Sequence, residues 1–200
     1  MNLPTATASE PLKTGLRHVT IFFSDLANFS AWTQKVGDVE ASNIASQILT
    51  LQSIIITRDG VGQVLHFGGD SVLAVFDTAS AALNRALEIQ RVLGRSGEEL
   101  SLKEPPRTKL RIGLHMGEVL VKEGERLEII SRHINRAHRV MESAVPGQIL
   151  ASEVVVEAGK DFINIPKEFL AIEYHGEFYL KGVGATQLCA VGLSAGPRAT

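Results

Sequence analysis

The sequence contains a single cysteine, few aromatic residues and no excess of charge of either sign. Cys189 has no second cysteine to pair with, so the chain forms no internal disulfide, which is typical of a reducing compartment. Twenty lysines and arginines against twenty-two acidic residues give a formal net charge of -2. Such a chain has no basic field for binding a nucleic acid, so we exclude nucleic acid as its partner.

Long hydrophobic runs and a secretion signal are also missing from the sequence. No apolar segment approaches the ~20 residues that a membrane-spanning helix requires. The first 15 residues, MNLPTATASEPLKTG, lack the basic start and apolar stretch of a signal peptide. We therefore expect no membrane segment, a cytoplasmic location, and flexible tails at residues 1–15 and 194–200.

The rest of the sequence has the composition of one globular domain, which we place at residues 16–193. Hydrophobic residues make up 44% and charged residues 21% of the 200, which is enough to build a full core. Short β-branched or aromatic runs predict strands at 18–25, 63–66, 71–76, 109–121, 127–130, 178–180 and 187–191. Helical spacing of apolar residues predicts helices at 30–57, 79–93 and 132–143, and the polar segment 94–107 predicts a loop.

The order of these elements predicts the fold class. Strand, helix, hairpin, helix and strand is the order of a ferredoxin-like βαββαβ core. This is an α+β fold with helices on one face of an antiparallel sheet, followed here by a C-terminal α/β extension. The sequence contains no internal repeat and no second domain.

Two aspartates stand where predicted strands end. Asp25 closes the first strand, and Asp70 lies in the tight turn of the hairpin that follows. Since that hairpin lies beside the first strand in the expected order, the two carboxylates can converge. Hard oxygen ligands suit Mg²⁺, which takes its remaining contacts from water and phosphate. From spacing alone an alternative stays open, in which Asp25 caps a helix and Asp70 is a turn residue.

The five residues after the first aspartate lead into a predicted helix; they are Leu26, Ala27, Asn28, Phe29 and Ser30. Free backbone N–H groups at a helix start, together with the positive end of the helix dipole, favour bound phosphate. We expect this segment to contact the phosphates of a substrate.

Three polar side chains in the C-terminal half complete the candidate site. Asn135 and Arg139 are four residues apart on a predicted helix, so both project from the same face. An amide and a guanidinium suit a ribose and the charge that develops at a transferring phosphorus. Lys181 stands between a strand and a Gly-rich turn, where its ammonium can reach a phosphate. Taken singly, each is also an ordinary solvated surface residue.

Six motifs follow one another along the chain. They are FFSDLANFS at 22–30, GGDSVLAVF at 68–76, RIGLHMGEV at 111–119, INRAHR at 134–139, PGQI at 146–149 and LKG at 180–182. Each motif is weak evidence alone. Together and in this order they resemble the catalytic domain of the class III adenylate and guanylate cyclases, across roughly residues 17 to 193.

The resemblance implies a role for each candidate residue. Asp25 and Asp70 correspond to two metal-binding aspartates, which hold two Mg²⁺ or Mn²⁺ ions per active site. Asn135 corresponds to the residue that orients the ribose, and Arg139 to the one that stabilises the pentavalent phosphorus. Lys181 corresponds to the lysine that holds the terminal phosphates.

The resemblance also implies a homodimer whose active sites lie between the subunits. The two aspartates of one chain would then face the asparagine, arginine and lysine of the other. The substrate would be a nucleoside triphosphate, and its ribose 3′ oxygen would attack the α-phosphorus in line. The products would be a 3′,5′-cyclic nucleotide and pyrophosphate, formed with metal assistance and without an evident protein base.

Three positions depart from the usual pattern of the family. Asn28 replaces the glycine of the phosphate-binding segment, which is tolerable because Asn accepts left-handed backbone angles. His66 and Glu128 stand where adenylate-forming members carry Lys and Asp or Thr, and guanylate-forming members carry Glu and Cys. His66 can donate to purine N1 and Glu128 can accept from the adenine amino group, so we expect ATP as the substrate and cyclic AMP as the product.

Other functions remain open at this point. Histidine can also accept a hydrogen bond from guanine, and a cytosine amino group would also satisfy Glu128, so the alternatives include a guanylate or pyrimidine nucleotide cyclase. A further alternative is a non-catalytic, nucleotide-binding regulatory homologue. The five chemistry-bearing positions are all retained, which argues against this last alternative.

Overall fold

The computed structural model describes residues 13–99, 109–123 and 127–194. The strands are β1 (Gly15–Leu26), β2 (Gly62–Phe67), β3 (Ser71–Phe76), β4 (Leu110–Glu123), β5 (Leu127–Ile130), β6 (Ile149–Ser152), β7 (Leu170–Leu180) and β8 (Gly184–Leu193). The helices are α1 (Phe29–Val36), α2 (Asp38–Thr57), α3 (Ala79–Glu99), α4 (Arg132–Ser143) and α5 (Glu153–Gly159). Most of the predicted tails and of the predicted loop at 94–107 lie outside the described residues.

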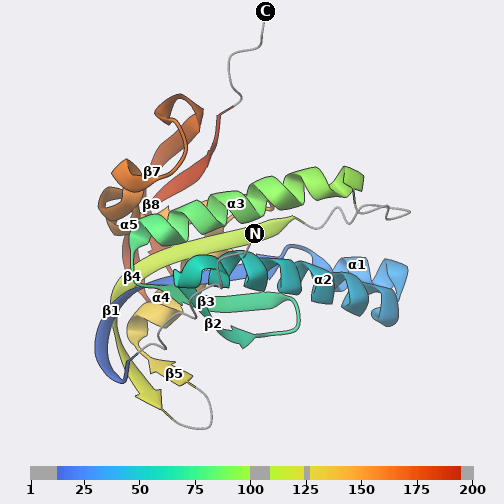
Figure 1. Ribbon diagram of the computed structural model, residues 1–200, viewed down its shortest axis with the longest axis horizontal. Coiled ribbons are helices and arrows are strands. Elements are labelled where there is room, and N and C mark those ends of the chain that lie inside the picture. The colour runs from blue at the N-terminus through green and yellow to red at the C-terminus, as the bar shows by residue number, and fades with distance from the viewer. Residues whose placement is uncertain (1–12, 100–108, 124–126, 195–200) are drawn as a thin grey trace, which may run out of the picture.

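All the described strands join one mixed sheet. Its order is β2-β3-β1-β4-β6-β8-β7, and β5 pairs with β4 off this path. Strands β2, β3, β1 and β4 pair antiparallel, which confirms the ferredoxin-like core and the α+β class. The C-terminal extension adds a parallel pair, β4 with β6. In Figure 1, β5 lies at the lower end of the molecule, and β7 and β8 lie at the upper end.

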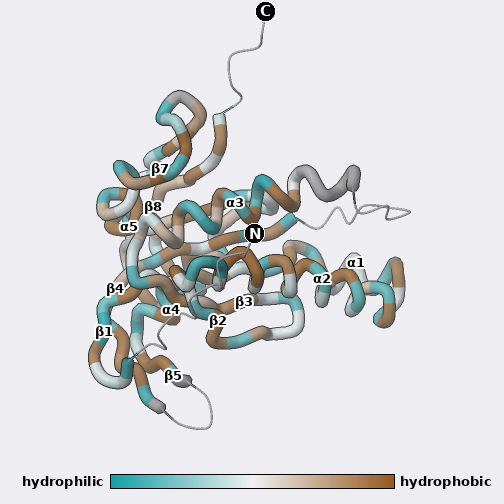
Figure 2. The backbone as a smooth tube through the Cα atoms, viewed as in Figure 1, coloured by the Kyte–Doolittle hydropathy of each residue, from teal (hydrophilic) through white to brown (hydrophobic). Residues whose placement is uncertain are grey.

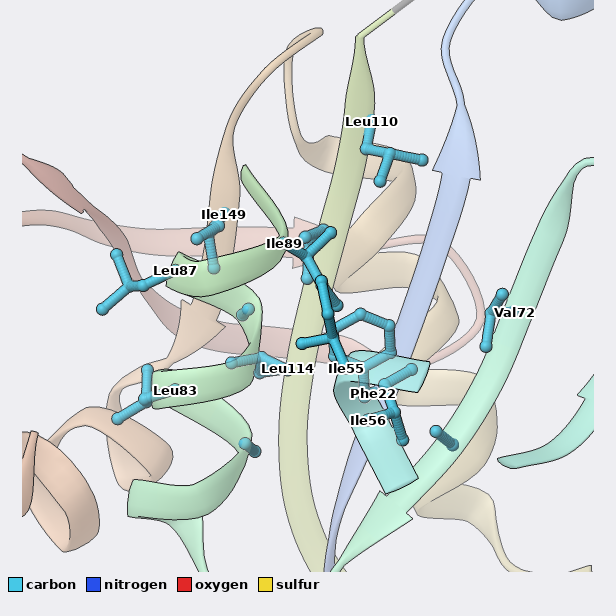
Figure 3. Close-up of a cluster of buried hydrophobic side chains, with 14 of the residues drawn as sticks. Phe22, Ile55, Ile56, Val72, Leu83, Leu87, Ile89, Leu110, Leu114 and Ile149 are labelled. Carbon is cyan, nitrogen blue, oxygen red and sulfur yellow. The ribbon is translucent and has the colours of Figure 1, made fainter. Parts of the chain in front are cut away.

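The main hydrophobic core lies between the sheet and the helices α2, α3 and α5. Figure 3 shows Phe22 of β1 close to Ile55 and Ile56 of α2. Leu114 of β4 and Leu83 of α3 belong to the same buried cluster. Helix α3 alternates between hydrophobic and hydrophilic residues along its length, as an amphipathic helix does (Figure 2). None of the helices in the described part of the chain is long and apolar enough to span a membrane.

Helices α2 and α3 of the ferredoxin-like core share one face of the sheet, as predicted, whereas α4, in the C-terminal extension, lies on the opposite face. Successive strand residues point to opposite faces. In β4, Ile112 packs in the core under α2 and α3, whereas Gly113 and Gly117 face α4. A Cβ added at Gly113 would lie 2.3 Å from the backbone nitrogen of Met141, and one at Gly117 would lie 2.3 Å from the ring of His133. These two glycines, which we call the α4 seat, let the helix lie directly on the strand.

Two helix boundaries differ from the sequence prediction. The predicted helix at 30–57 is two helices, α1 and α2, because Gly37 adopts φ 90° and ψ 156° between them. The apolar periodicity continues across this glycine and therefore hides the break. Helix α3 continues past the predicted end at Leu93, since an interior glycine such as Gly94 costs a helix only about 1 kcal/mol.

The α4 seat generates a test of the fold. Replacing Gly113 with alanine should lower the free energy of unfolding by about 1–3 kcal/mol, because the new methyl group would overlap the backbone of Met141. Urea denaturation of Gly113→Ala measures the change. The matched control is Gly192→Ala, where the same methyl group meets nothing within 4 Å. Equal stability of the two variants would contradict this packing of α4.

Candidate active site

The backbone brings Asp25 and Asp70 to the same end of the sheet. Asp25 is the last but one residue of β1 and pairs with Ser71, the first residue of β3. Asp70 precedes Ser71 in a tight turn in which Gly69 has φ 69°. The backbone N–H of Leu26 donates to the carbonyl oxygen of Asp70 at 3.2 Å. The end of β1 is therefore tied to the turn that carries the second aspartate.

The two carboxylates interact electrostatically. Burial raises the pKa of Asp70 above its ordinary value, and the negative charge of Asp25 raises it further. Arg111 acts on the pKa of Asp70 in the opposite direction. A cation between the two carboxylates would relieve this repulsion.

Arg111 is a site residue that the sequence analysis did not single out. It stands directly opposite Asp25 in the β1–β4 pairing, and its guanidinium forms an ion pair with the Asp25 carboxylate. Its Nε–H is buried and has no hydrogen-bond partner within the described part of the chain. Arg111 could have been found from the sequence only by aligning the predicted strands 18–25 and 109–121 as antiparallel neighbours, because that pairing places Arg111 opposite Asp25.

The donor set fits a hard divalent cation. Asp25 and Asp70 supply carboxylate oxygens, and Mg²⁺ completes its octahedral shell with water and substrate phosphate. Among residues 13–99, 109–123 and 127–194, no group of three or more His, Cys, Asp or Glu side chains is placed to hold a metal. The arrangement therefore suits Mg²⁺ or Mn²⁺ shared with a phosphate substrate, rather than a closed structural zinc site.

Two of the five residues predicted to contact phosphate already use their backbone amides within the chain. Leu26 and Ala27 are buried, and their amides already donate, to Asp70 and, at 3.0 Å, to the carbonyl oxygen of Lys109. Asn28 adopts the left-handed conformation, with φ 61° and ψ 24°, at the N-cap of α1, as expected of an Asn in place of glycine. The amides that remain at the start of α1 belong to residues 28–30, where a helix leaves its first N–H groups without helical partners.

Helix α4 presents Asn135 and Arg139 away from the sheet. Its buried residues are Ala137, Val140 and Met141, and Asn135 is exposed. Arg139 forms an ion pair with Glu142, one turn further along the helix. The N-terminus of α4 is capped by Ser131, whose hydroxyl accepts from the His133 amide at 3.1 Å.

Lys181 is exposed in the turn between β7 and β8. The turn is closed by the Val183 amide, which donates to the Leu180 carbonyl at 3.0 Å. Within the described residues, no hydrogen bond or ion pair joins Lys181, Asn135 or Arg139 to either aspartate. One chain therefore holds two separate groups of candidate residues, the aspartates with Arg111 and the set on α4 and the β7–β8 turn.

A β-bulge in β2 turns His66 onto the face of the sheet that carries α4. The β2–β3 register shifts between Val64 and His66, and His66 pairs with Leu73. Leu73 packs with the hydrophobic cluster under α4. Because directly paired residues share a face, His66 lies on the same face as the helix with Asn135.

Glu128 lies on the other face of the sheet. It is exposed and pairs with Lys122 across the β4–β5 hairpin. The next residue, Ile129, packs with the cluster under α4, so alternation turns Glu128 away from that helix. The structure therefore does not bring His66 and Glu128 to one face, and a joint contact with the base stays a prediction.

Comparisons with solved structures find the same fold in several enzymes. The adenylyl cyclase CyaB from P. aeruginosa superposes with a TM-score of 0.76 at 22% identity, covering 94% of this chain and 98% of that chain. The guanylate cyclase domain of RhGC from Catenaria anguillulae, in complex with GTP, gives 0.70 at 23%, covering 88% and 96%. Adenylate cyclases from Trypanosoma brucei in their monomeric state give 0.74 at 20%, covering 98% and 96%. At these identities the likeness shows the fold alone.

The family of the chain follows from a match to a protein-family model. A comparison with curated protein sequences gives no significant match. The family model described as "Adenylate and Guanylate cyclase catalytic domain" matches residues 13–191, which run from the residues before β1 into β8. This chain therefore belongs to the adenylate and guanylate cyclase catalytic-domain family.

Proposed function

We propose that the chain is a nucleotide cyclase that converts ATP to 3′,5′-cyclic AMP and pyrophosphate. The observation that carries this proposal is the convergence of Asp25 and Asp70 at the end of β1, where the negative charge of Asp25 helps to raise the pKa of Asp70. Family membership supplies the reaction class, since the family is that of adenylate and guanylate cyclases. The choice of ATP rests on His66 and Glu128 and is tested separately below.

We propose further that the active site forms between two copies of the chain. Within the described residues, no hydrogen bond or ion pair joins the aspartates to Asn135, Arg139 or Lys181, which supports a site that a second copy completes. The outer face of the β4–β5 hairpin supports a dimer contact. Leu16, Leu120 and Ile130 lie side by side there through strand pairing and are 65%, 36% and 51% exposed.

In the proposed site each side chain has one task. Asn135 hydrogen-bonds the ribose and holds its 3′ oxygen in line with the α-phosphorus. Arg139 places a fixed positive charge beside the phosphorus as negative charge develops on its oxygens. Lys181 and the amides of residues 28–30 hold the terminal phosphates. Asp25 and Asp70 would hold two divalent cations, which when bound would lower the pKa of the 3′ hydroxyl and offset phosphate charge.

Arg111 extends this set. Its guanidinium lies beside the Asp25 carboxylate and has a buried, unpaired Nε–H. A buried N–H without a partner costs free energy that a phosphate oxygen can recover. We therefore assign Arg111 a contact with the substrate phosphates at the same end of β1.

The first test is turnover with each of the four nucleoside triphosphates and Mn²⁺, with cyclic product identified by mass spectrometry. Asp25→Asn should reduce turnover to below about 1% of the parent value while the circular dichroism spectrum stays unchanged, since the variant loses one charged ligand of the metal site. The control is Asp161→Asn, which removes an exposed carboxylate far along the chain, beyond α5.

Two results would contradict the proposal. Near-parental turnover in Asp25→Asn would remove the metal assignment. Absence of cyclic product from every nucleotide would instead favour a nucleotide-binding homologue without catalytic activity.

Base selection is tested through the ratio of kcat/KM for ATP to that for GTP. His66→Lys should raise this ratio about tenfold, because a lysine donates to adenine N1 but cannot accept from guanine N1–H. Glu128→Ala should lower the ratio by removing an acceptor for the adenine amino group. If the ratio is unchanged in both variants, these side chains do not contact the base and the preference for ATP is lost.

A further inference from the structure

A chain of hydrogen bonds links β6, β4 and the start of α4 on the face of the sheet that α4 covers. His115 of β4 is only 4% exposed. Its Nδ1 lies 2.8 Å from the Ser152 hydroxyl, and its Nε2 lies 3.0 Å from Nδ1 of His133. The two imidazole rings stack, with centroids 5.2 Å apart.

The surroundings of both histidines favour the neutral imidazole. Burial, followed by the nearby charges of His133, Arg136 and His18, lowers the pKa of His115 to about 3. Burial, then Arg132, Arg136 and His18, also lowers the pKa of His133, and Glu118 acts in the opposite direction. A neutral imidazole has one donor and one acceptor nitrogen, so the three groups can form a continuous donor-to-acceptor chain in either direction.

The chain of hydrogen bonds lies inside the α4 seat. His115 stands between Gly113 and Gly117 on the same face of β4, and both glycines are closed over by α4. Apolar packing of a helix on a strand is not directional, so it resists separation more strongly than sliding. The bond between His115 and His133 is directional, and it fixes the first turn of α4 along the strand together with a second polar contact. That contact is the 2.6 Å hydrogen bond that the Ser131 hydroxyl at the helix N-cap donates to the Glu118 carbonyl of β4.

We propose that His115 and His133 are positioning residues that hold helix α4 in register so that Asn135 and Arg139 meet the nucleotide. This inference rests on the proposed function, because it assigns the histidines a task in the same active site. Asn135 and Arg139 follow His133 by two and six residues on one continuous helix. A shift of about 1 Å in such groups can cost about 100-fold in rate.

The test uses two substitutions of nearly equal size. In His133→Asn, the amide oxygen occupies roughly the place of Nδ1 and preserves a polar partner for His115. In His133→Leu, a side chain of similar shape has no polar atom. We expect kcat of the Leu variant to fall by about 10- to 100-fold with KM for the nucleotide changed by less than about threefold. The Asn variant should stay within about threefold of the parent kcat.

A second measurement does not depend on catalysis. Amide hydrogen exchange of the α4 residues, recorded without metal or nucleotide, should accelerate in His133→Leu and stay near the parent rate in His133→Asn. The control His175→Leu changes a histidine on β7 that stacks on Phe178, and it should alter neither α4 exchange nor kcat.

The outcomes distinguish the positioning role of the two histidines from the proposed cyclase activity. Equal kcat in the parent and His133→Leu, equal losses in the Leu and Asn variants, or unchanged α4 exchange in His133→Leu would each overturn the positioning role. If the parent chain forms no cyclic nucleotide, the proposed function fails. Faster α4 exchange in the Leu variant alone would then still support the register-fixing hydrogen bond.

Discussion

The antiparallel pairing of β1 with β3 on one side and β4 on the other is the constraint on which the site depends. This pairing places Asp25 opposite both Ser71 and Arg111. It therefore brings the turn with Asp70 and a balancing guanidinium to the same carboxylate. A one-residue slip in either register would turn Asp25 to the other face of the sheet and separate these charges.

The two faces of the sheet differ in what they carry. The large core under α2, α3 and α5 buries most of the long aliphatic side chains, whereas the opposite face carries α4, Asp25 and Arg111. Strand alternation along β4 maintains this division, with Ile112 and Leu114 on the core face and Arg111, Gly113 and His115 on the other. The motif RIGLHMGEV is thus two interleaved patterns, one that fills the core and one that builds the site.

Much of this arrangement could be predicted from the sequence, and the part that could not has identifiable physical causes. Asp25 and Asp70 were predictable because the first stands near the end of an apolar strand and the second in the tight turn of a hairpin, and Asn28 because its type tolerates a positive φ. The Gly37 break, the placement of α4 on the second face and the bulge before His66 were not predictable. Each depends on a register or a close backbone contact, which apolar periodicity does not encode. The role of Arg111 was not predicted for the same reason, since its partner Asp25 is 86 residues away in the sequence.

The central claim is a site shared between two chains, and it is tested most directly by mixing two inactive variants. Asp25→Asn and Arg139→Ala would each be inactive as homodimers, yet a heterodimer would keep one active site with both residues intact. An equal mixture that exchanges freely should recover about a quarter of the parental activity, because half of the dimers are mixed and each has one intact site of two. An inactive mixture in which heterodimers are demonstrated by native mass spectrometry would contradict the shared site.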